Sequence, residues 1–558
     1  MTTAGPFDRN SMLDRLRHET FDVLVVGGGI TGVGVALDAA TRGLRTALVE
    51  RNDFASGTSS KSSKMVHGGL RYLQQGDVRL VYEALHERQR LRKNAPHLVS
   101  VLPFMIPILA RPSAGAGPGN ETRSVVSRKV ARALGSAMWM YDLTGGWRIG
   151  KLHRRLGAAA ALAHMPTMPE ARVVAAYLYF DAAVDDARLV VSIARTAAIH
   201  GAAVANGCRV VGFTHAADGK VDGVTAEADG VTFPIRSRVV VNAAGVWSDL
   251  VRALDEGSDP DSIRPAKGVH MVVPWQKVRN DIAVVIPVPK DKRSLFVVPW
   301  GPTGDGAFTH TYVGTTDTDY DGPLDDPQCT AEDIAYMLRA LNASVTTGVT
   351  VDDVTGVWAG LRPLVKSASS GRTADLSRRH SVSRNEHGVV TVTGGKLTTY
   401  REMAEDTVDD VLDALGRRVR CRTKRLRLLG ALDRPTSHLE ARFGTLAADV
   451  QQLVDDDPRL AEPLVEGLPY LTAEAVYAVR NEMARSLDDV LSRRTRALIL
   501  DREATVAAAP RVAEIIAAEL GWLSAEASLQ VERFVAMCRA EERAAQPPLA
   551  RPDPGAPT

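Results

Sequence analysis

Cysteine is scarce in this sequence of 558 residues. Its four cysteines stand far apart, at positions 208, 329, 421 and 538. This spacing contains no CxxC redox pair and no paired metal-binding motif, and it predicts no disulfide framework. We therefore expect no metal site.

Long apolar runs and a strong charge of one sign are also missing. The apolar stretch 101–110 is much shorter than the ~18–20 residues that a spanning helix needs, and it contains two prolines. The amino terminus is too polar for a secretory signal. The net charge of +2 gives no global field for nucleic acid. We expect a chain that is not exported, whose membrane contact is peripheral and which has no nucleic-acid partner.

The remaining composition is that of a folded, multidomain protein. Apolar residues make up 45% of the chain and charged residues 24%, both close to the globular average. At ~150 residues per domain, the length predicts three or four domains. Helix-like segments dominate from about residue 425 onward, which predicts a separate helical C-terminal domain.

A dinucleotide-binding motif opens the ordered sequence at residues 21–50, FDVLVVGGGITGVGVALDAATRGLRTALVE. Gly27, Gly29 and Gly32 fit GxGxxG between an apolar strand and a helix of small residues. Glu50 ends the next strand, 18 residues after Gly32. There a carboxylate can accept ribose hydroxyls, which argues against NADP. The alternative, a glycine turn without a ligand, fits fewer of these features.

The motif alone does not separate NAD from FAD. Two later strands also end in tight glycine turns, one at Gly245 and one at Gly394 and Gly395. Several points of close backbone approach favour an extended flavin nucleotide, although each turn taken alone is compatible with an ordinary β-turn.

Seven ordered motifs give the sequence a closer resemblance. They are ASGTSSKSSKMVHGGLRYLQ, VDDARLV, NAAGVWSD, KGVHMVVP, VGTTDTDY, GLRPL and GGKLTTYRE. Together they resemble FAD-dependent glycerol-3-phosphate dehydrogenases, and the similarity extends into the helical segment 482–501. The resemblance implies oxidation of sn-glycerol 3-phosphate to dihydroxyacetone phosphate, by hydride transfer from C2 to flavin N5 and onward transfer of electrons to a quinone. An oxygen-using oxidase, an amine or amino-acid oxidase and a non-catalytic flavin-binding protein are the alternatives.

The same resemblance implies an α/β fold similar to that of D-amino-acid oxidases. A Rossmann-like FAD-binding domain would be interleaved with a mixed β-sheet substrate domain, followed by an all-α domain. The expected boundaries are 18–110, 172–262 and 382–416 for the FAD-binding domain, 111–171 and 263–381 for the substrate domain, 425–545 for the helical domain and 546–558 for a disordered tail.

Substrate recognition requires fixed cations, because glycerol 3-phosphate carries a nearly dianionic phosphate. The resemblance implicates Arg71, next to Tyr72, and Arg362. Arg378 is a third candidate that the sequence does not separate from Arg379. Any of these arginines taken alone is more typical of a solvated surface.

The reaction also needs a base for the C2 hydroxyl and a positive environment near the flavin. His270, on an apolar strand, is the preferred base, because histidine accepts protons near neutral pH. A buried core histidine is the alternative reading, and His67 and His380 are weaker candidates. Lys396 precedes a predicted helix that we expect under the flavin ring, where it would add a cation near the flavin or the substrate. A solvated lysine in the first helical turn is the alternative. With His270 and Arg362, Lys396 completes the predicted catalytic set. Thr398 would cap that helix or bond the flavin edge.

Further cofactor contacts follow from the family pattern. The serines and threonines of 56–63 lack the His and acid that a nucleophile needs, so either hydrogen bonds to the cofactor's pyrophosphate or plain solvation of the loop explains them. The resemblance implies cofactor contact through Thr58, Ser59 and Ser63. The complete predicted cofactor set is Gly27, Gly29, Ile30, Thr31, Gly32, Glu50, Arg51, Thr58, Ser59, Ser63, His67, Gly68, Gly69, Leu70, Ala244, Gly245, Gly395, Lys396, Leu397 and Thr398.

Two basic stretches are candidates for contact with an anionic membrane. In the first, residues 147–156, basic side chains alternate with apolar ones after Trp147, which on a helix would give an interfacial pattern. The second is 417–427. A solvated surface explains either stretch equally well. We expect a cytoplasmic enzyme that binds peripherally to the inner face of the cell membrane. The sequence does not decide whether it forms a homodimer.

Overall fold

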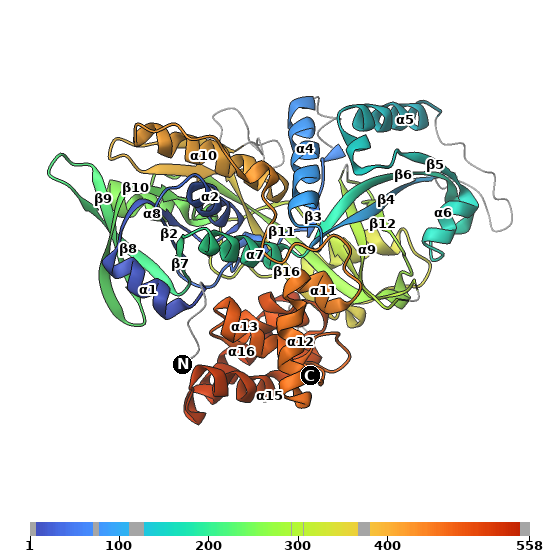
Figure 1. The fold of residues 1–558 in the computed structure, drawn as a ribbon. Coiled ribbons are helices and arrows are strands. Elements are labelled where there is room, and N and C mark those ends of the chain that lie inside the picture. The colour runs from blue at the N-terminus through green and yellow to red at the C-terminus, as the bar shows by residue number, and fades with distance from the viewer. Residues whose placement is uncertain are drawn as a thin grey trace, which may run out of the picture.

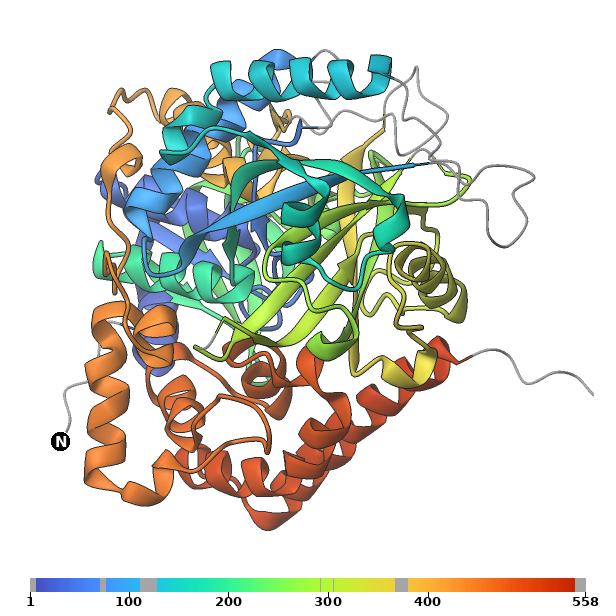
Figure 2. The same ribbon diagram turned by 90° about the vertical axis from the view of Figure 1, so that its right-hand side faces the viewer.

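The computed structural model describes residues 7–70, 77–110, 128–291, 293–304, 306–366 and 380–546. Within these residues the chain forms two β-sheets with flanking helices and a separate helical region. That region lies at the bottom of the molecule in both views (Figures 1 and 2). Among the described helices, none is both long enough and apolar enough to cross a membrane.

The first sheet has a parallel centre. In order across the sheet, its strands are β17 (Ser381–Arg384), β18 (Val390–Thr393), β10 (Val231–Asn242), β1 (Thr20–Val26), β2 (Thr46–Val49) and β7 (Ala203–Ala205). All neighbours except β17 and β18 run parallel. Strand β1 is buried from its second residue onward, as its continuous apolar sequence predicts for a strand covered on both faces. An antiparallel pair, β8 (Cys208–His215) and β9 (Val221–Ala228), extends this sheet from β10.

Helix α2 (Ile30–Thr41) follows β1 and is buried along almost its whole length. It packs against α7 (Asp186–Ile199) and α10 (Tyr400–Ala414). Small residues make this approach possible, since a Cβ on Gly34 would come within 2.8 Å of the Tyr400 ring. The βαβ unit predicted for residues 21–50 is therefore present.

The second sheet is mixed and mostly antiparallel. Its main path is β15 (Thr318–Asp319), β11 (Ile263–Pro274), β14 (Phe308–Gly314), β13 (Ser294–Pro302), β12 (Ala283–Pro287), β4 (Val99–Leu109), β6 (Val173–Val184) and β3 (Met65–Val66). Strand β16 (Gly356–Val365) pairs with β11, and β5 (Arg154–Gly157) pairs with β6. The remaining helices of the two sheet regions are α1 (Arg9–His18), α4 (Val78–Asn94), α5 (Arg128–Leu143), α6 (Ala158–His164), α8 (Ser248–Glu256) and α9 (Ala331–Asn342).

The expected domain boundaries differ from the structure at three strands. The ranges 18–110 and 172–262 were assigned to the FAD-binding domain, yet β3, β4 and β6 lie in the second sheet. The reason is long-range pairing: β4 and β6 form an antiparallel ladder that runs from Val99 opposite Val184 to Leu109 opposite Val173. Neither strand carries a local signal for the sheet that it joins.

The helical region contains α11 (His438–Phe443), α12 (Ala447–Asp456), α13 (Thr472–Glu482), α14 (Ala497–Leu500), α15 (Arg502–Leu520) and α16 (Ser524–Ala545). A π-helical segment, Asp489–Arg494, carries arginines into the contact with the first sheet region. Arg494 and Arg493 bond the buried Asp53 at 2.6 and 2.7 Å. Burial alone would raise the pKa of Asp53, but these two guanidinium groups outweigh it and hold the pKa at about 2. Paired buried charges thus join the helical region to the rest of the chain.

The first basic stretch does not form the helix on which its interfacial pattern was based. Gly146–Ile149 is a 3-10 turn and Arg154–Gly157 is strand β5, because residues 154–157 pair with β6. Even so, Trp147 and Leu152 are about half exposed. In the second stretch, Lys424 pairs with Glu405 at 2.8 Å and Arg427 with Asp433 at 3.0 Å.

Candidate active site

The glycine turn after β1 brings three backbone segments into close contact. Gly27 has a φ of +114°, and a Cβ there would lie 2.7 Å from the carbonyl oxygen of Ala243. A Cβ on Gly32 would lie 1.9 Å from the carbonyl oxygen of Gly27. Only glycine fits these two positions, so the turn leaves an open surface at the N-terminus of α2, a position suited to phosphate groups.

Glu50 borders this turn with both carboxylate oxygens engaged. Its Oε2 accepts the N–H of Gly28 at 2.7 Å, and its Oε1 accepts the N–H of Asn52 at 2.8 Å. Burial raises the pKa of Glu50, and these two N–H donors act in the opposite direction. The carboxylate is therefore held in one orientation at the end of β2, where the sequence places a ribose ligand.

The loop 56–63, here called the serine loop, runs beside the same turn. Ser59 accepts the Ile30 N–H at 2.9 Å, and Thr58 donates to the Leu361 carbonyl at 2.5 Å. Ser63 bonds Nε2 of His270 at 2.9 Å. The loop thus connects the first sheet region to strands β16 and β11 of the second sheet.

A second glycine turn, at Gly394 and Gly395, leads into α10. Both glycines have left-handed φ angles, and a Cβ on Gly395 would lie 2.3 Å from Sδ of Met403. The predicted helix begins here with the 3-10 turn Leu397–Thr399. Thr398 does not cap it: its hydroxyl accepts the N–H of His67 at 3.2 Å.

His270 occupies the centre of the second sheet. Its ring stacks on Trp358 of β16, with centroids 4.6 Å apart and planes 8° apart. On its other side stands Gly314 of β14, where a Cβ would lie 2.1 Å from the ring. Burial, then Lys64 and Arg362, hold the pKa of His270 well below its usual range. The imidazole is therefore neutral near pH 7, and its Nδ1 has no hydrogen-bond partner among the described residues.

Arg362 lies on β16, next to the same part of β11. Its guanidinium donates to Asp317 at 3.1 Å and to Oγ1 of Thr315 at 3.2 Å. A Cβ on Gly268 would lie 2.4 Å from its Nη2, so this glycine makes room for the guanidinium. Gly268 and His270 are two residues apart and share one face of β11, which places the arginine and the histidine on the same side.

One cavity of about 550 Å³ gathers these features, within the usual size range of ligand sites. It is lined by the predicted base His270, by Arg362 and Lys396, which we predict to bind substrate and to support the chemistry, and by Gly27, Gly29, Ile30, Thr31, Glu50, Arg51, Thr58, Ser59, Ser63, His67, Ala244, Gly245, Gly395, Leu397 and Thr398 of the predicted cofactor set.

Several residues of the predicted cofactor, base and substrate sets do not line this cavity or lie outside the described residues. Gly32 supports the turn from beneath without lining the cavity, and Gly68, Gly69 and Leu70 are also outside its lining. The Gly68 N–H points to Asp181 instead, at 3.2 Å. The weaker base candidate His380 pairs with Asp406 and is not part of the lining. Arg71, Tyr72, Arg378 and Arg379 lie outside the described residues.

Sequence reasoning missed several lining residues. Trp247 packs against Gly57, where a Cβ would approach its ring to 2.8 Å, and Arg51 lies 4.5 Å from the ring centroid. Leu250 and Leu254 of α8 extend this apolar wall. Their spacing of four residues on a short helix was the available signal. Asp317, which fixes Arg362, lies within the VGTTDTDY motif that gave the resemblance.

The fold and the cavity define a dinucleotide-dependent oxidoreductase with a separate helical domain. The sequence matches the family of FAD dependent oxidoreductases over residues 22–401 and the C-terminal domain of alpha-glycerophosphate oxidase over residues 421–527. FAD as the cofactor class, predicted from the sequence, is confirmed by this family.

Comparison with individual proteins narrows the family. The chain is 39% identical to glycerol-3-phosphate dehydrogenase 2 of Mycobacterium tuberculosis, across 96% of this chain and 91% of the relative. It is 36% identical to the human mitochondrial glycerol-3-phosphate dehydrogenase, across 93% and 73%. The crystal structure of the Bacillus halodurans glycerol-3-phosphate dehydrogenase complexed with FAD superposes with a TM-score of 0.75 at 29% identity, covering 98% and 99% of the two chains. The chain belongs to the FAD-dependent glycerol-3-phosphate dehydrogenase family, as its motifs predicted.

The residues present fit a flavin nucleotide. The Gly27 turn offers a surface without side chains, Glu50 offers an oriented carboxylate, and Trp247 adds an indole N–H that has no partner among the described residues. The Gly27 turn and the serine loop would hold its pyrophosphate, and Lys396 and His270 line the same cavity.

Proposed function

We propose that this protein oxidises sn-glycerol 3-phosphate to dihydroxyacetone phosphate and passes the electrons to a quinone. One observation carries the proposal: a buried histidine and an arginine lie on one face of the second sheet, in the cavity that the Gly27 turn also lines. FAD, when bound, supplies a two-electron acceptor for the hydride that leaves C2.

His270 would take the proton of the C2 hydroxyl. Its stacking on Trp358 and its bond to Ser63 restrain the ring, and its low pKa keeps the imidazole unprotonated. An imidazole must be unprotonated before it can accept a proton, and a fixed ring avoids reorientation during the reaction. The other ring nitrogen, Nδ1, makes no hydrogen bond to any described residue.

Arg362 would bind the substrate phosphate. Asp317 and Thr315 fix the guanidinium, so its planar fork is presented in a single orientation. Lys396, at the start of the turn before α10, would add positive charge beside the flavin or the substrate. Arg71, Tyr72 and Arg378 remain predicted substrate ligands. A fixed cation of this kind suits a phosphorylated alcohol better than an amine, which disfavours an amine oxidase.

A peripheral membrane contact would give access to quinone. Trp139 and Leu143 of α5 are 57% and 77% exposed, and Trp147 and Leu152 are 53% and 50% exposed. Helix α5 lies at the top of the molecule, opposite the helical domain (Figures 1 and 2). Exposed aromatic residues beside Arg148 and Arg154 are typical of an interfacial surface.

Oxygen is the second candidate acceptor, because the helical domain matches that of alpha-glycerophosphate oxidase. An anaerobic experiment separates the possibilities. Glycerol 3-phosphate should bleach the flavin of the purified protein within the time of one catalytic turnover. A soluble quinone should then restore the flavin colour. Recovery with oxygen at an equal rate would assign an oxidase, and failure to bleach would remove the substrate proposal.

A further inference from the structure

Three polar side chains from distant parts of the chain meet at the outer edge of the first sheet. His215 ends β8, Asp255 lies in the last turn of α8, and His387 lies in the turn between β17 and β18. They are separated by 40 and 132 residues along the chain. None of them lines the 550 Å³ cavity.

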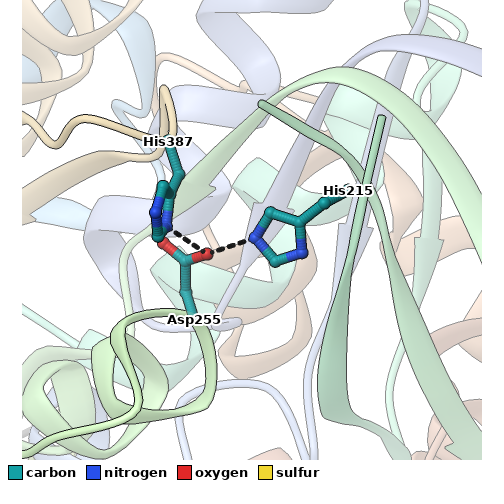
Figure 3. Close-up of side chains that lie close together, drawn as sticks. All are labelled: His215, Asp255 and His387. Carbon is teal, nitrogen blue, oxygen red and sulfur yellow. Dashed lines mark hydrogen bonds and ion pairs between the residues drawn. The ribbon is translucent and has the colours of Figure 1, made fainter. Parts of the chain in front are cut away.

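Both histidines aim at the same carboxylate oxygen (Figure 3). Nε2 of His215 lies 2.9 Å and Nδ1 of His387 lies 3.0 Å from Oδ1 of Asp255. The three potential ligand atoms all lie within 4.8 Å of one another. The rings are nearly perpendicular, at 87°, with centroids 5.3 Å apart. Two imidazole nitrogens thus converge on one carboxylate oxygen.

The carboxylate is held from behind. Nδ2 of Asn385 donates to the other oxygen of Asp255 at 2.7 Å, and Oδ1 of Asn385 accepts the Val389 N–H at 2.9 Å. The Asp255 side chain is 1% exposed, whereas those of His215 and His387 are 34% and 30% exposed. The oxygen that faces the histidines is therefore fixed, while the rings border water.

The surrounding charges belong to this arrangement as well. Nε2 of His387, the nitrogen that points away from Asp255, lies 4.0 Å from a carboxylate oxygen of Glu386. Glu256 bonds Asn385 and pairs with Arg252 at 3.0 Å, so this neighbouring acid is already neutralised. Lys220 donates to the Glu386 carbonyl.

We propose that Nε2 of His215, Nδ1 of His387 and Oδ1 of Asp255 bind a divalent transition-metal ion, with zinc as the best fit. Zinc is held by imidazole nitrogen and carboxylate oxygen at about 2.0–2.2 Å, usually with four ligands. Three protein ligands and the exposed side of the rings leave the fourth position to water. Magnesium and calcium prefer sites made of oxygen alone, so they fit this set poorly. The alternative is that no metal binds and that each histidine is joined to the Asp255 carboxylate by a hydrogen bond.

The location suggests what the ion does. Strand β8 begins at Cys208 and α8 carries Leu250 and Leu254, and these residues line the cavity. Strand β8 ends at His215, and Asp255 lies in the last turn of α8. A metal would therefore fasten a strand, a helix and a turn that border the cofactor cavity. This inference does not depend on the identity of the substrate.

The test is metal binding by the flavin-loaded protein. After removal of metals with a chelator and exchange into metal-free buffer, zinc chloride is titrated calorimetrically, and the midpoint of thermal unfolding is measured with and without zinc. We expect one zinc per chain and a zinc-dependent rise in that midpoint. His215→Ala and His387→Ala should each weaken zinc binding at least 10-fold and remove most of the rise, since each loses one of three ligands.

His164→Ala is the matched control. Nδ1 of His164 lies 2.9 Å from Oδ1 of Asp281, another surface histidine–aspartate pair, and His164 is absent from the clustered ligands found among the described residues. This variant should bind zinc as the parent does. Because His215 and His387 are partly exposed, their alanine variants should retain flavin, which verifies folding.

Cobalt provides a second readout: its visible absorption should indicate a four-coordinate site in the parent and be lost in both variants. Zinc stoichiometry that is unchanged in the two variants, or no zinc binding by the flavin-loaded parent, would overturn the proposal and leave the hydrogen-bonded pairs.

Discussion

At the proposed cofactor end of the cavity, the surface is made by backbone and by glycines without side chains, whereas at the proposed substrate end it is made by specific side chains. Gly27 and Gly29 lie within one local motif of β1 and α2. His270 and Arg362 come from two antiparallel strands, and Asp317, Thr315 and Trp358 hold them in place. The first end depends on the left-handed backbone of Gly27 and on the absence of side chains, and the second depends on electrostatics. Substitutions should therefore fail in different ways at the two ends.

The largest effect is expected from Gly27→Ala. The variant places a Cβ 2.7 Å from the Ala243 carbonyl oxygen at a φ of +114°, which costs about 2–4 kcal/mol of stability and closes the phosphate surface. We expect purified protein with little or no flavin, measured by its visible absorbance. Gly43→Ala is the control, because Gly43 also has a positive φ, +78°, but a Cβ there meets no atom within 4 Å. It should cost about 1 kcal/mol and keep full flavin. Stoichiometric flavin in Gly27→Ala would contradict the role of the turn.

Replacement of His270 should leave the cofactor end intact and stop the chemistry. His270→Gln should retain flavin and slow its anaerobic reduction by about 10²–10⁴-fold, the usual contribution of a general base. The pH dependence sharpens the assignment. Because the pKa of His270 lies well below 6.5, the ring stays neutral as pH falls to about 6, so the parent rate should remain flat there and decline only at lower pH. Stopped-flow reduction that titrates near pH 6.5 would instead favour another base.

Arg362→Ala should separate substrate binding from cofactor binding. Loss of the charge-assisted bonds to phosphate should raise KM by about 100-fold or more, with flavin content unchanged. Arg264→Ala is the control: Arg264 lies on β11 in the same sheet and pairs with Asp319 at 2.6 Å, but it does not line the cavity. Its kinetics should match those of the parent. Equal KM values for both variants would remove Arg362 from the phosphate site.

This contrast also explains how much could be predicted from the sequence. The glycine turn, Glu50 and α2 follow one another within thirty residues, so local spacing predicts their geometry. For Arg362 and His270, composition predicts only a surface arginine and a core histidine, and the resemblance to a family was needed to select them. The membership of β4 and β6 in the second sheet could not be predicted, because it depends on pairing between strands about 70 residues apart. Sequence reasoning also missed the cluster of His215, Asp255 and His387, because these residues are far apart in the sequence and form no local motif.

The serine loop links the two ends of the cavity, and Lys61 on this loop interacts with Glu541 of the helical domain. Burial raises the pKa of Glu541 to about 7, and Arg502 and Lys61 offset this only in part. The folded state therefore binds a proton that the unfolded state releases between about pH 4.5 and 7, so this group makes the parent less stable as pH rises through that window.

Glu541→Gln should remove this loss of stability at high pH. We expect the variant to be about 1–2 kcal/mol more stable at pH 8 and equal to the parent near pH 4.5, measured by denaturant unfolding at both pH values. Glu542→Gln, which removes a charge from the same helix, controls for net charge. A stability difference in Glu541→Gln that is the same at both pH values would show that packing, and not proton binding, determines the effect of this acid on the helical domain.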